Sequence, residues 1–148
     1  SPNGLAVLAP DTADDIIEAF PEIEQWVIGG HSLGGVMAAD YARDNDPVEG
    51  LALWASYPQD GTDLSDSALE VTSIYASEDG LTTLEDIEAS REQLPPDTVF
   101  VEIEGGNHAG FGWYGEQDGD GVATISREEQ QAQVVAATLQ LLASVEAG

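Results

Sequence analysis

Residues 26–42 read WVIGGHSLGGVMAADYA, a segment that joins an apolar run to a helical pattern through a glycine-rich turn. The run from Trp26 to Ile28 is typical of a short buried strand, and apolar residues recur at helical spacing after Ser32. Within this segment, GHSLG places one glycine two residues before the serine and another two residues after it. A sharp strand-to-helix turn leaves little room around its central residue, so the pattern predicts a strained turn that holds the Ser32 hydroxyl above a sheet. The alternative is an ordinary glycine-rich turn in which Ser32 caps the helix.

Helix and strand patterns alternate along the rest of the chain. Thr82 with Glu85, and Ser126 with Glu129, match the capping box that starts a helix. Strands separated by helices predict a parallel sheet with helices on both faces, the three-layer α/β class, and residues 1–148 are expected to form one domain. The expected helices cover residues 11–20, 32–43, 82–94 and 126–145, and the expected strands cover residues 26–28, 48–56, 71–77 and 98–104. The last helix is expected to bury Val134, Val135, Thr138, Leu141, Leu142 and Val145.

The charge balance is strongly acidic, with 29 Asp and Glu, three Arg, no Lys and a formal net charge of −26. Phosphate backbones require a basic surface, so the composition excludes nucleic-acid binding. No apolar run approaches the roughly 18 residues that indicate a membrane helix, and there is no cysteine to form a disulfide or act as a nucleophile. The acidic residues are dispersed, which predicts a solvated acidic surface that salt stabilises, as in proteins of salt-loving organisms.

A serine nucleophile needs a neighbouring base, and the chain has two histidines. His31 directly precedes Ser32, and neighbours on a tight turn point in different directions, so we expect His31 to line the pocket or pack in the turn. His108 follows the fourth predicted strand, in GGNHAGFGWYG. Because the carboxyl ends of parallel strands meet at one edge of a sheet, His108 is the predicted base.

The third group of a catalytic triad is a carboxylate that orients the histidine. Asp79 follows the third predicted strand and is the favoured candidate. Asp60 and Asp63, after the second strand, and Glu78, beside Asp79, are the alternatives. The chain order serine, aspartate, histidine is the order of the α/β-hydrolases.

Three segments resemble the α/β-hydrolase superfamily: GGHSLGG, SIYASEDGL and EIEGGNHAGFGWYGEQDGDGVATISREEQ. More narrowly, the chain is similar to α/β-hydrolase family 5, a small bacterial and archaeal branch related to dienelactone hydrolases. The resemblance implies that Ser32 is the nucleophile, Asp79 the acid and His108 the base. A serine in place of the cysteine usual in true dienelactone hydrolases argues against that particular activity.

The resemblance covers only the C-terminal part of the fold. A full α/β-hydrolase has several strands before the nucleophile, whereas 31 residues precede Ser32 here. Mapped onto the family, the chain supplies strands five to eight with their flanking helices, and the family's second oxyanion donor lies outside it. The nucleophile strand would then be an open edge, which predicts either pairing with a preceding segment or homo-oligomer formation.

The backbone N–H of Leu33, at the start of a helix, is the predicted oxyanion donor. We expect His31, Tyr57, Phe111 and Trp113 to line the substrate pocket, although aromatic residues in a loop can also pack onto the core. Asp118 and Asp120, in EQDGDG, lack the full ligand spacing of a calcium loop, so no metal site or cofactor is expected.

The residues therefore predict a serine hydrolase that cleaves small carboxylic esters through an acyl-enzyme. Thioesterase, deacetylase and peptidase activities would use the same triad. The alternative from another class is a binding or scaffold domain that has kept the fold and lost catalysis. Neither hypothesis involves a membrane or a nucleic acid.

Overall fold

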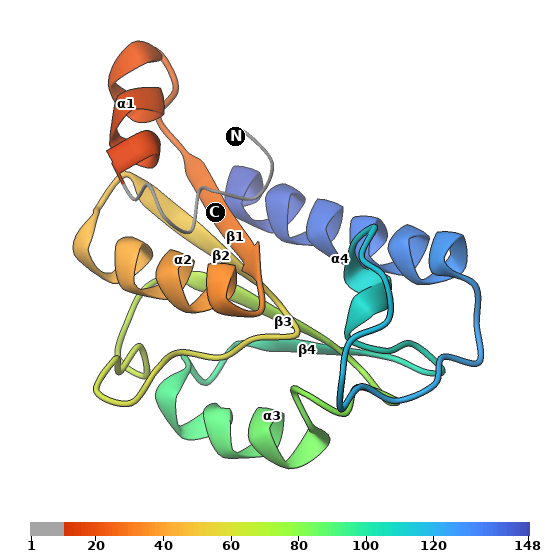
Figure 1. The fold of residues 1–148 in the computed structure, drawn as a ribbon. Helices are drawn as coiled ribbons and strands as arrows, with labels where there is room; N and C mark the ends of the chain where they lie inside the picture. Colours follow the sequence, from red (N-terminus) through yellow and green to blue (C-terminus); the bar gives the residue numbers. More distant parts are fainter. Residues whose placement is uncertain (1–10) are drawn as a thin grey trace.

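The computed structural model describes residues 11–148, which form a four-stranded parallel sheet (Figure 1). The strands stand side by side in chain order, β1-β2-β3-β4, and every neighbouring pair is parallel. This confirms the predicted α/β class. The strands are β1 (Trp26–His31), β2 (Val48–Trp54), β3 (Glu70–Ala76) and β4 (Val99–Ile103).

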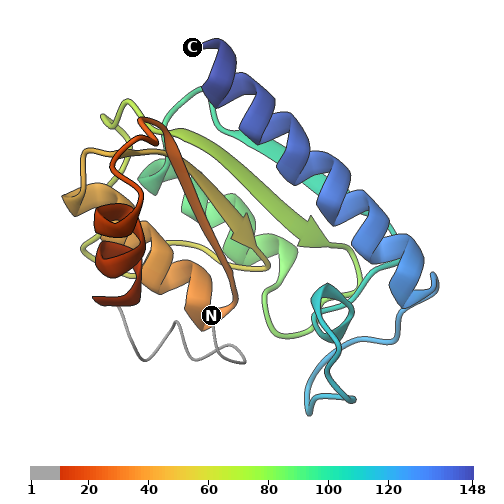
Figure 2. The same ribbon diagram turned by 90° about the horizontal axis from the view of Figure 1, so that it is seen from above.

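Helices cover both faces of the sheet, so the molecule has three layers (Figures 1 and 2). Helices α2 and α3 lie on one face, and the long α4 crosses the other. Helix α1 lies beside α2 near β1, and the Tyr41 hydroxyl of α2 donates to Asp14 of α1. The helices are α1 (Asp11–Ala19), α2 (Leu33–Asp44), α3 (Leu84–Ser90) and α4 (Arg127–Ala147), with 3₁₀ turns η2 (Arg91–Gln93) and η3 (Ala109–Phe111).

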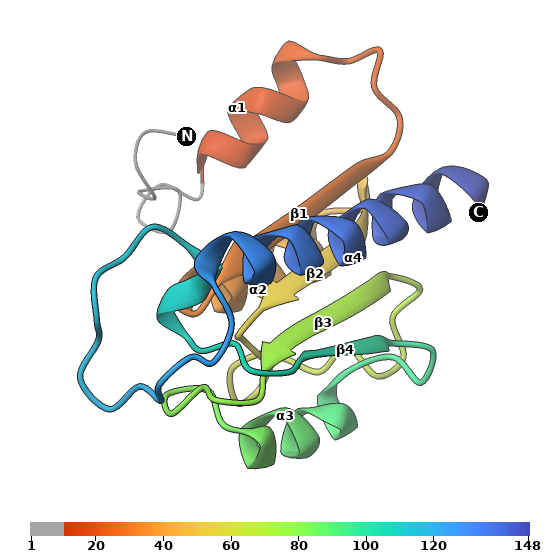
Figure 3. The same ribbon diagram turned by 90° about the vertical axis from the view of Figure 1, so that its right-hand side faces the viewer.

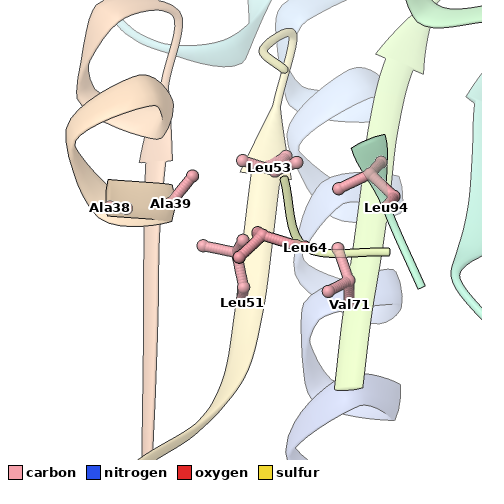
Figure 4. Packing of buried hydrophobic residues seen from close by; sticks show 7 residues of the cluster. All are labelled: Ala38, Ala39, Leu51, Leu53, Leu64, Val71 and Leu94. Atoms are coloured by element: carbon pink, nitrogen blue, oxygen red, sulfur yellow. The ribbon is translucent and has the colours of Figure 1, made fainter. Parts of the chain in front are cut away.

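The core follows from the alternation of side chains along the strands. Leu51 and Leu53 of β2 point toward α2, where Ala38 and Ala39 allow the helix to pack closely (Figure 4). Ala52, between them, belongs to a separate cluster with residues of α4. Both faces of the sheet are therefore apolar, as expected for parallel strands between two helical layers.

Two local details differ from the predictions. The capping box of α3 is formed by Thr83 and Asp86, one residue later than expected. Thr82 is buried and instead donates its hydroxyl to the carbonyl of Ala55, the residue after β2, 2.9 Å away. Ser126 caps α4 by accepting from the N–H of Glu129 at 3.1 Å, but the return bond from the Ser126 N–H to the Glu129 side chain, which would complete the predicted capping box, is not formed.

The buried side of α4 is rotated relative to the predicted one. Val134, Leu141 and Val145 are buried as expected, whereas Val135 and Leu142 are exposed. Gln130 and Ala137 occupy the buried side in their place. Ala137 allows close packing on the sheet, and Gln130 has a polar role in the site described below.

The outer edge of β1 has no strand paired to it among residues 11–148. Next to this edge lies an apolar cavity of about 170 Å³, formed by α1, β1, Tyr41 and Val48. The Trp26 indole nitrogen is buried without a hydrogen-bond partner in this part of the chain. As to the helices between residues 11 and 148, none has both the length and the apolar character needed to span a bilayer.

Candidate active site

Ser32 stands at the tip of a strained turn between β1 and α2. Its φ is 55°, in the left-handed region that few non-glycine residues adopt. A Cβ on Gly30 would collide with the backbone of Gly34 and Gly35, and a Cβ on Gly35 would collide with the Ser56 side chain. The glycines are therefore required by the close approach of strand and helix.

The end of β2 holds this turn in place. The N–H of Ser32 donates to the carbonyl of Trp54 at 3.0 Å, and the hydroxyl of Ser56 donates to the carbonyl of Ser32 at 2.6 Å. Ala55, between Trp54 at the end of β2 and Ser56 after it, also has a positive φ, 48°, and is fully buried. A second strained position therefore lies directly after the neighbouring strand, between the two residues that bond to the Ser32 backbone.

His108 and Asp79 form a buried pair at the same edge of the sheet. His108 Nδ1 lies 2.8 Å from Asp79 Oδ2, and both side chains are buried. The other oxygen of Asp79 accepts from the N–H groups of Leu81 and Thr82, each at 2.8 Å. In the tautomer with the proton on Nδ1, this nitrogen donates to Asp79 Oδ2 and Nε2 has a free lone pair.

The loops after β3 and β4 bring this pair together. Both loops begin at the ends of their strands, on the same side of the sheet (Figure 3). A pocket of about 360 Å³ at this place includes both Ser32 and His108 in its walls. Within residues 11–148, the Ser32 hydroxyl makes no hydrogen bond to His108; such bonds often tighten only when substrate binds. The pocket is lined by Ser32, Leu33, Val36, Ala55, Ser56, Tyr57, Gln59, Leu81, Thr82 and His108.

Leu33 is the first residue of α2, so its backbone N–H has no acceptor within the helix. This N–H is at the positive end of the helix dipole. The Leu33 side chain is 61% exposed and lines the pocket. The position suits a donor to a developing oxyanion beside Ser32.

The four residues predicted to line the pocket are placed differently from one another. Tyr57 lines it. Phe111 lies in the core with α4 residues, is 6% exposed and does not reach the pocket. Trp113 is 73% exposed, with the Arg127 guanidinium 5.4 Å from its ring centroid.

His31 is also absent from the pocket lining, because its ring packs behind the site. Its centroid lies 4.5 Å from that of His108, 5.5 Å from that of Phe111 and 5.4 Å from that of Tyr114. Burial lowers the pKa of His31 to about 4, and the adjacent His108 contributes to the shift. His31 is therefore a neutral ring that supports His108.

The alternative acids lie away from the base. Asp60 and Glu78 are exposed, and Asp63 accepts from the N–H of Ser65 on the surface. Of the four candidates, only Asp79 has a contact with His108. Asp118 is exposed, and among the residues that the structure describes no group of three or more His, Cys, Asp or Glu could hold a metal ion.

Several residues of the site had no distinctive signal in the sequence. Val36 and Gln59 line the pocket without belonging to a motif, and Leu81 and Thr82 line it although the motifs that contain them predicted no such role. Asp120 and Gln130 contact the backbone around His108. Both lie in the segment after β4 that resembles the α/β-hydrolases, but nothing in that segment predicted a contact with the His108 loop.

A parallel sheet lies between two layers of helices, and its strand β1 leads into helix α2 through a strained turn at a serine. These features define the α/β hydrolase class. The model of the alpha/beta hydrolase family matches residues 1–132, and the chain belongs to this family. No curated protein matches the sequence.

Solved structures show the same fold at low identity. A putative α/β hydrolase from Agrobacterium tumefaciens has a TM-score of 0.68 at 15% identity, over 93% of this chain and 60% of that one. A carboxylesterase of Nitrososphaera gargenis has a TM-score of 0.61 at 14% identity, over 93% of this chain and 72% of that one. A dienelactone hydrolase-like promiscuous phosphotriesterase from metagenomic libraries has a TM-score of 0.65 at 18% identity, over 88% of this chain and 57% of that one. The chain thus spans about 60% of the first of these proteins and forms part of the fold.

Proposed function

We propose that this chain carries the nucleophile, base and acid of a serine hydrolase that cleaves small carboxylic esters. The observation that carries the proposal is the buried hydrogen bond between His108 Nδ1 and Asp79 Oδ2, 2.8 Å long, in a pocket that Ser32 also lines. A neutral imidazole with Nδ1 held by a carboxylate has its other nitrogen available for the serine proton. The strained turn directs the serine at the same pocket.

In the proposed reaction, Ser32 Oγ bonds to the ester carbonyl carbon while His108 Nε2 takes the hydroxyl proton. The carbonyl electrons move onto oxygen, and the resulting oxyanion accepts a hydrogen bond from the N–H of Leu33. The bond to the alcohol then breaks, and the alcohol leaves with the proton from His108. Water activated by His108 attacks the acyl-enzyme, releases the acid and restores the Ser32 hydroxyl.

A second oxyanion donor is expected from a segment paired with the outer edge of β1. The α/β-hydrolases that the sequence resembles take this donor from a loop in the N-terminal part of the fold. Losing one such donor typically costs about 100- to 1000-fold in rate. We therefore expect full activity only when the edge of β1 is covered.

Two features favour ester substrates. The pocket walls combine apolar side chains, such as Leu33 and Val36, with a few polar groups. Among proteins of the same fold, one is described as a carboxylesterase and another, from Paleococcus ferrophilus, as a monoacylglycerol lipase. A pocket of about 360 Å³ fits a short acyl chain better than a long one.

The test is labelling with a fluorophosphonate, which forms a covalent adduct only with an activated serine. We expect one adduct, on Ser32, that Ser32→Ala abolishes and His108→Ala strongly slows. Ser144→Ala is the matched control, because this exposed hydroxyl lies on α4 and does not line the pocket. Absence of labelling in the longest natural form of the protein, in high salt, would contradict the proposal.

The second candidate function is a binding or scaffold domain without catalysis. The observation that favours it is the absence, in residues 11–148, of a hydrogen bond between the Ser32 hydroxyl and His108. This alternative predicts no labelling even when the edge of β1 is covered. It also predicts that Ser32→Ala leaves ligand binding in the pocket intact.

A further inference from the structure

The backbone around His108 is held by side chains at four consecutive positions. The backbone N–H groups of residues 107 to 110 all donate to side-chain oxygens. In a helix or strand, such N–H groups would instead donate to backbone carbonyls. The N–H groups of His108 and Ala109 donate to the two oxygens of Asp120, each at 3.0 Å. The N–H of Asn107 donates to Gln130 at 3.2 Å, and the N–H of Gly110 to the Asn107 side chain at 2.9 Å.

Asp120 also reaches the loop that carries the acid. Its Oδ1 accepts from the N–H of Gly80, the residue after Asp79, at 3.3 Å. The same oxygen accepts from its own neighbour Gly121 at 2.9 Å. One carboxylate is therefore bonded to the residue that follows the acid, to the base itself and to the residue that follows the base.

Close packing makes this connection possible. A Cβ on Gly80 would collide with the carbonyl of Gly119, and a Cβ on Gly121 would collide with the carbonyl of Glu78. The Asn107 side chain adds a further bond, to the carbonyl of Gly121 at 3.0 Å. The turn at 119–121 is thus seated directly against both loops.

The charge of Asp120 is balanced by these N–H groups. Although partial burial alone would raise the pKa of Asp120, the N–H donors of Ala109, His108, Gly80 and Gly121 lower it below the usual value. In the described part of the chain, the ion pairs of arginine join Arg43 to Asp44 and Arg91 to Glu88, and the Arg127 side chain binds the carbonyl of Tyr114. Asp120 is thus an ionised carboxylate whose partners are the two loops of the site.

We infer that Asp120 is a positioning residue that keeps Asp79 and His108 in register by tying their loops together. Its consequence for catalysis rests on the proposed serine hydrolase function, because Asp120 itself does not line the pocket. Small displacements of a base relative to its partners cost rate without loss of substrate binding. Removing the tie should therefore lower kcat and leave KM near its original value.

The experiment compares Asp120→Asn with Asp118→Asn, which makes the same charge change on an exposed side chain of the same loop. The first measurement is the proton NMR signal of the His108 Nδ1–H, assigned with His31→Asn because the chain has only two histidines. The second is the rate of fluorophosphonate labelling at Ser32, together with kcat and KM for a short-chain ester.

We expect Asp120→Asn to broaden or abolish the Nδ1–H signal and to slow labelling about 10- to 100-fold. Asp118→Asn should keep both at the wild-type level. A wild-type signal and labelling rate in Asp120→Asn would overturn the inference. If wild type is not labelled at Ser32, the proposed function fails, and the NMR signal alone decides the role of Asp120.

Hydrogen exchange of the wild-type protein gives a second test. It needs no variant, so it can be made even if Asp120→Asn does not fold. If Asp120 ties the loops, the amides of Gly80, His108 and Ala109 should be protected and should open together. Fast exchange at Gly80 with protection at His108 and Ala109 would contradict the tie.

Discussion

The ring of His31 packs against the ring of His108, with their centroids 4.5 Å apart. On its other sides, His31 meets the rings of Phe111 and Tyr114. The residue before the nucleophile thus connects the serine turn to the loop of the base. Because its ring is enclosed by these neighbours, His31 is costly to protonate in the folded protein.

This enclosure predicts a specific pH dependence of stability. Burial, with a smaller effect of His108, lowers the pKa of His31 from 6.5 in the unfolded chain to about 4 in the folded protein. Between these values the unfolded state binds the proton more readily, so the free energy of unfolding falls as the pH drops from 6.5 toward 4. The contribution of His31 is up to about 3 kcal/mol.

The measurement is urea unfolding of wild type and His31→Asn from pH 4 to pH 7. The carboxylates are the same in both proteins, so their effects cancel in the difference between the two curves. We expect the wild-type curve to fall more steeply below pH 6.5. Parallel curves would show that His31 is protonated equally in the folded and unfolded states.

A second prediction concerns the glycines of the serine turn. Gly30→Ala should destabilise the protein by about 1–3 kcal/mol, because its Cβ would collide with the backbone of Gly34 and Gly35. It should also slow labelling of Ser32. Gly115→Ala is the control, since a Cβ there meets nothing within 4 Å. The comparison is made by thermal unfolding, and equal melting temperatures for the two variants would refute the role given to Gly30.

The serine turn and the sheet could be predicted from sequence because their signals are local. The glycine at position 30 reflects the close approach of β1 to the start of α2, which involves residues only a few positions apart. The apolar runs of the strands reflect burial on both faces. The N-cap of α3 was harder to predict, because two adjacent threonines could fill this position. Thr83 caps the helix, and the hydroxyl of Thr82 donates to the carbonyl of Ala55.

The remaining parts of the site depend on how distant loops meet. With 29 acidic residues, the position of Asp79 after a strand favoured it but left Asp60, Asp63 and Glu78 as alternatives. Its contact with His108 arises only when the loops after β3 and β4 come together. Phe111 lies in the core for a similar reason: it packs against residues of α4, which come later in the chain, and the sequence around Phe111 does not reveal that contact.

A third prediction follows from the open edge of β1. Unpaired strand edges recruit other strands, and apolar side chains are exposed close by, among them Ile16, Phe20 and Ile23. We expect residues 1–148 alone to self-associate with increasing concentration. A form that carries the additional N-terminal strands of longer α/β hydrolases should be less prone to do so. Sedimentation velocity of the two forms, at equal salt, provides the measurement. A 148-residue chain that stays monomeric at all concentrations would contradict this prediction.

A fourth prediction concerns salt. With a net charge of −26, repulsion between carboxylates opposes the compact state, and the few arginines can offset little of it. At 1 M salt the screening length is about 3 Å, so repulsion between most surface carboxylates is suppressed. The melting temperature should therefore rise steeply between low salt and 1 M KCl and more slowly above it.

Sucrose is the control, because it stabilises compact states by exclusion from the surface without screening charge. If the repulsion argument is right, Glu→Gln changes at the three exposed glutamates of α4, Glu128, Glu129 and Glu146, should raise stability at low salt and flatten the response to KCl. A melting temperature that falls on addition of KCl would rule out electrostatic repulsion as the main effect of the acidic surface.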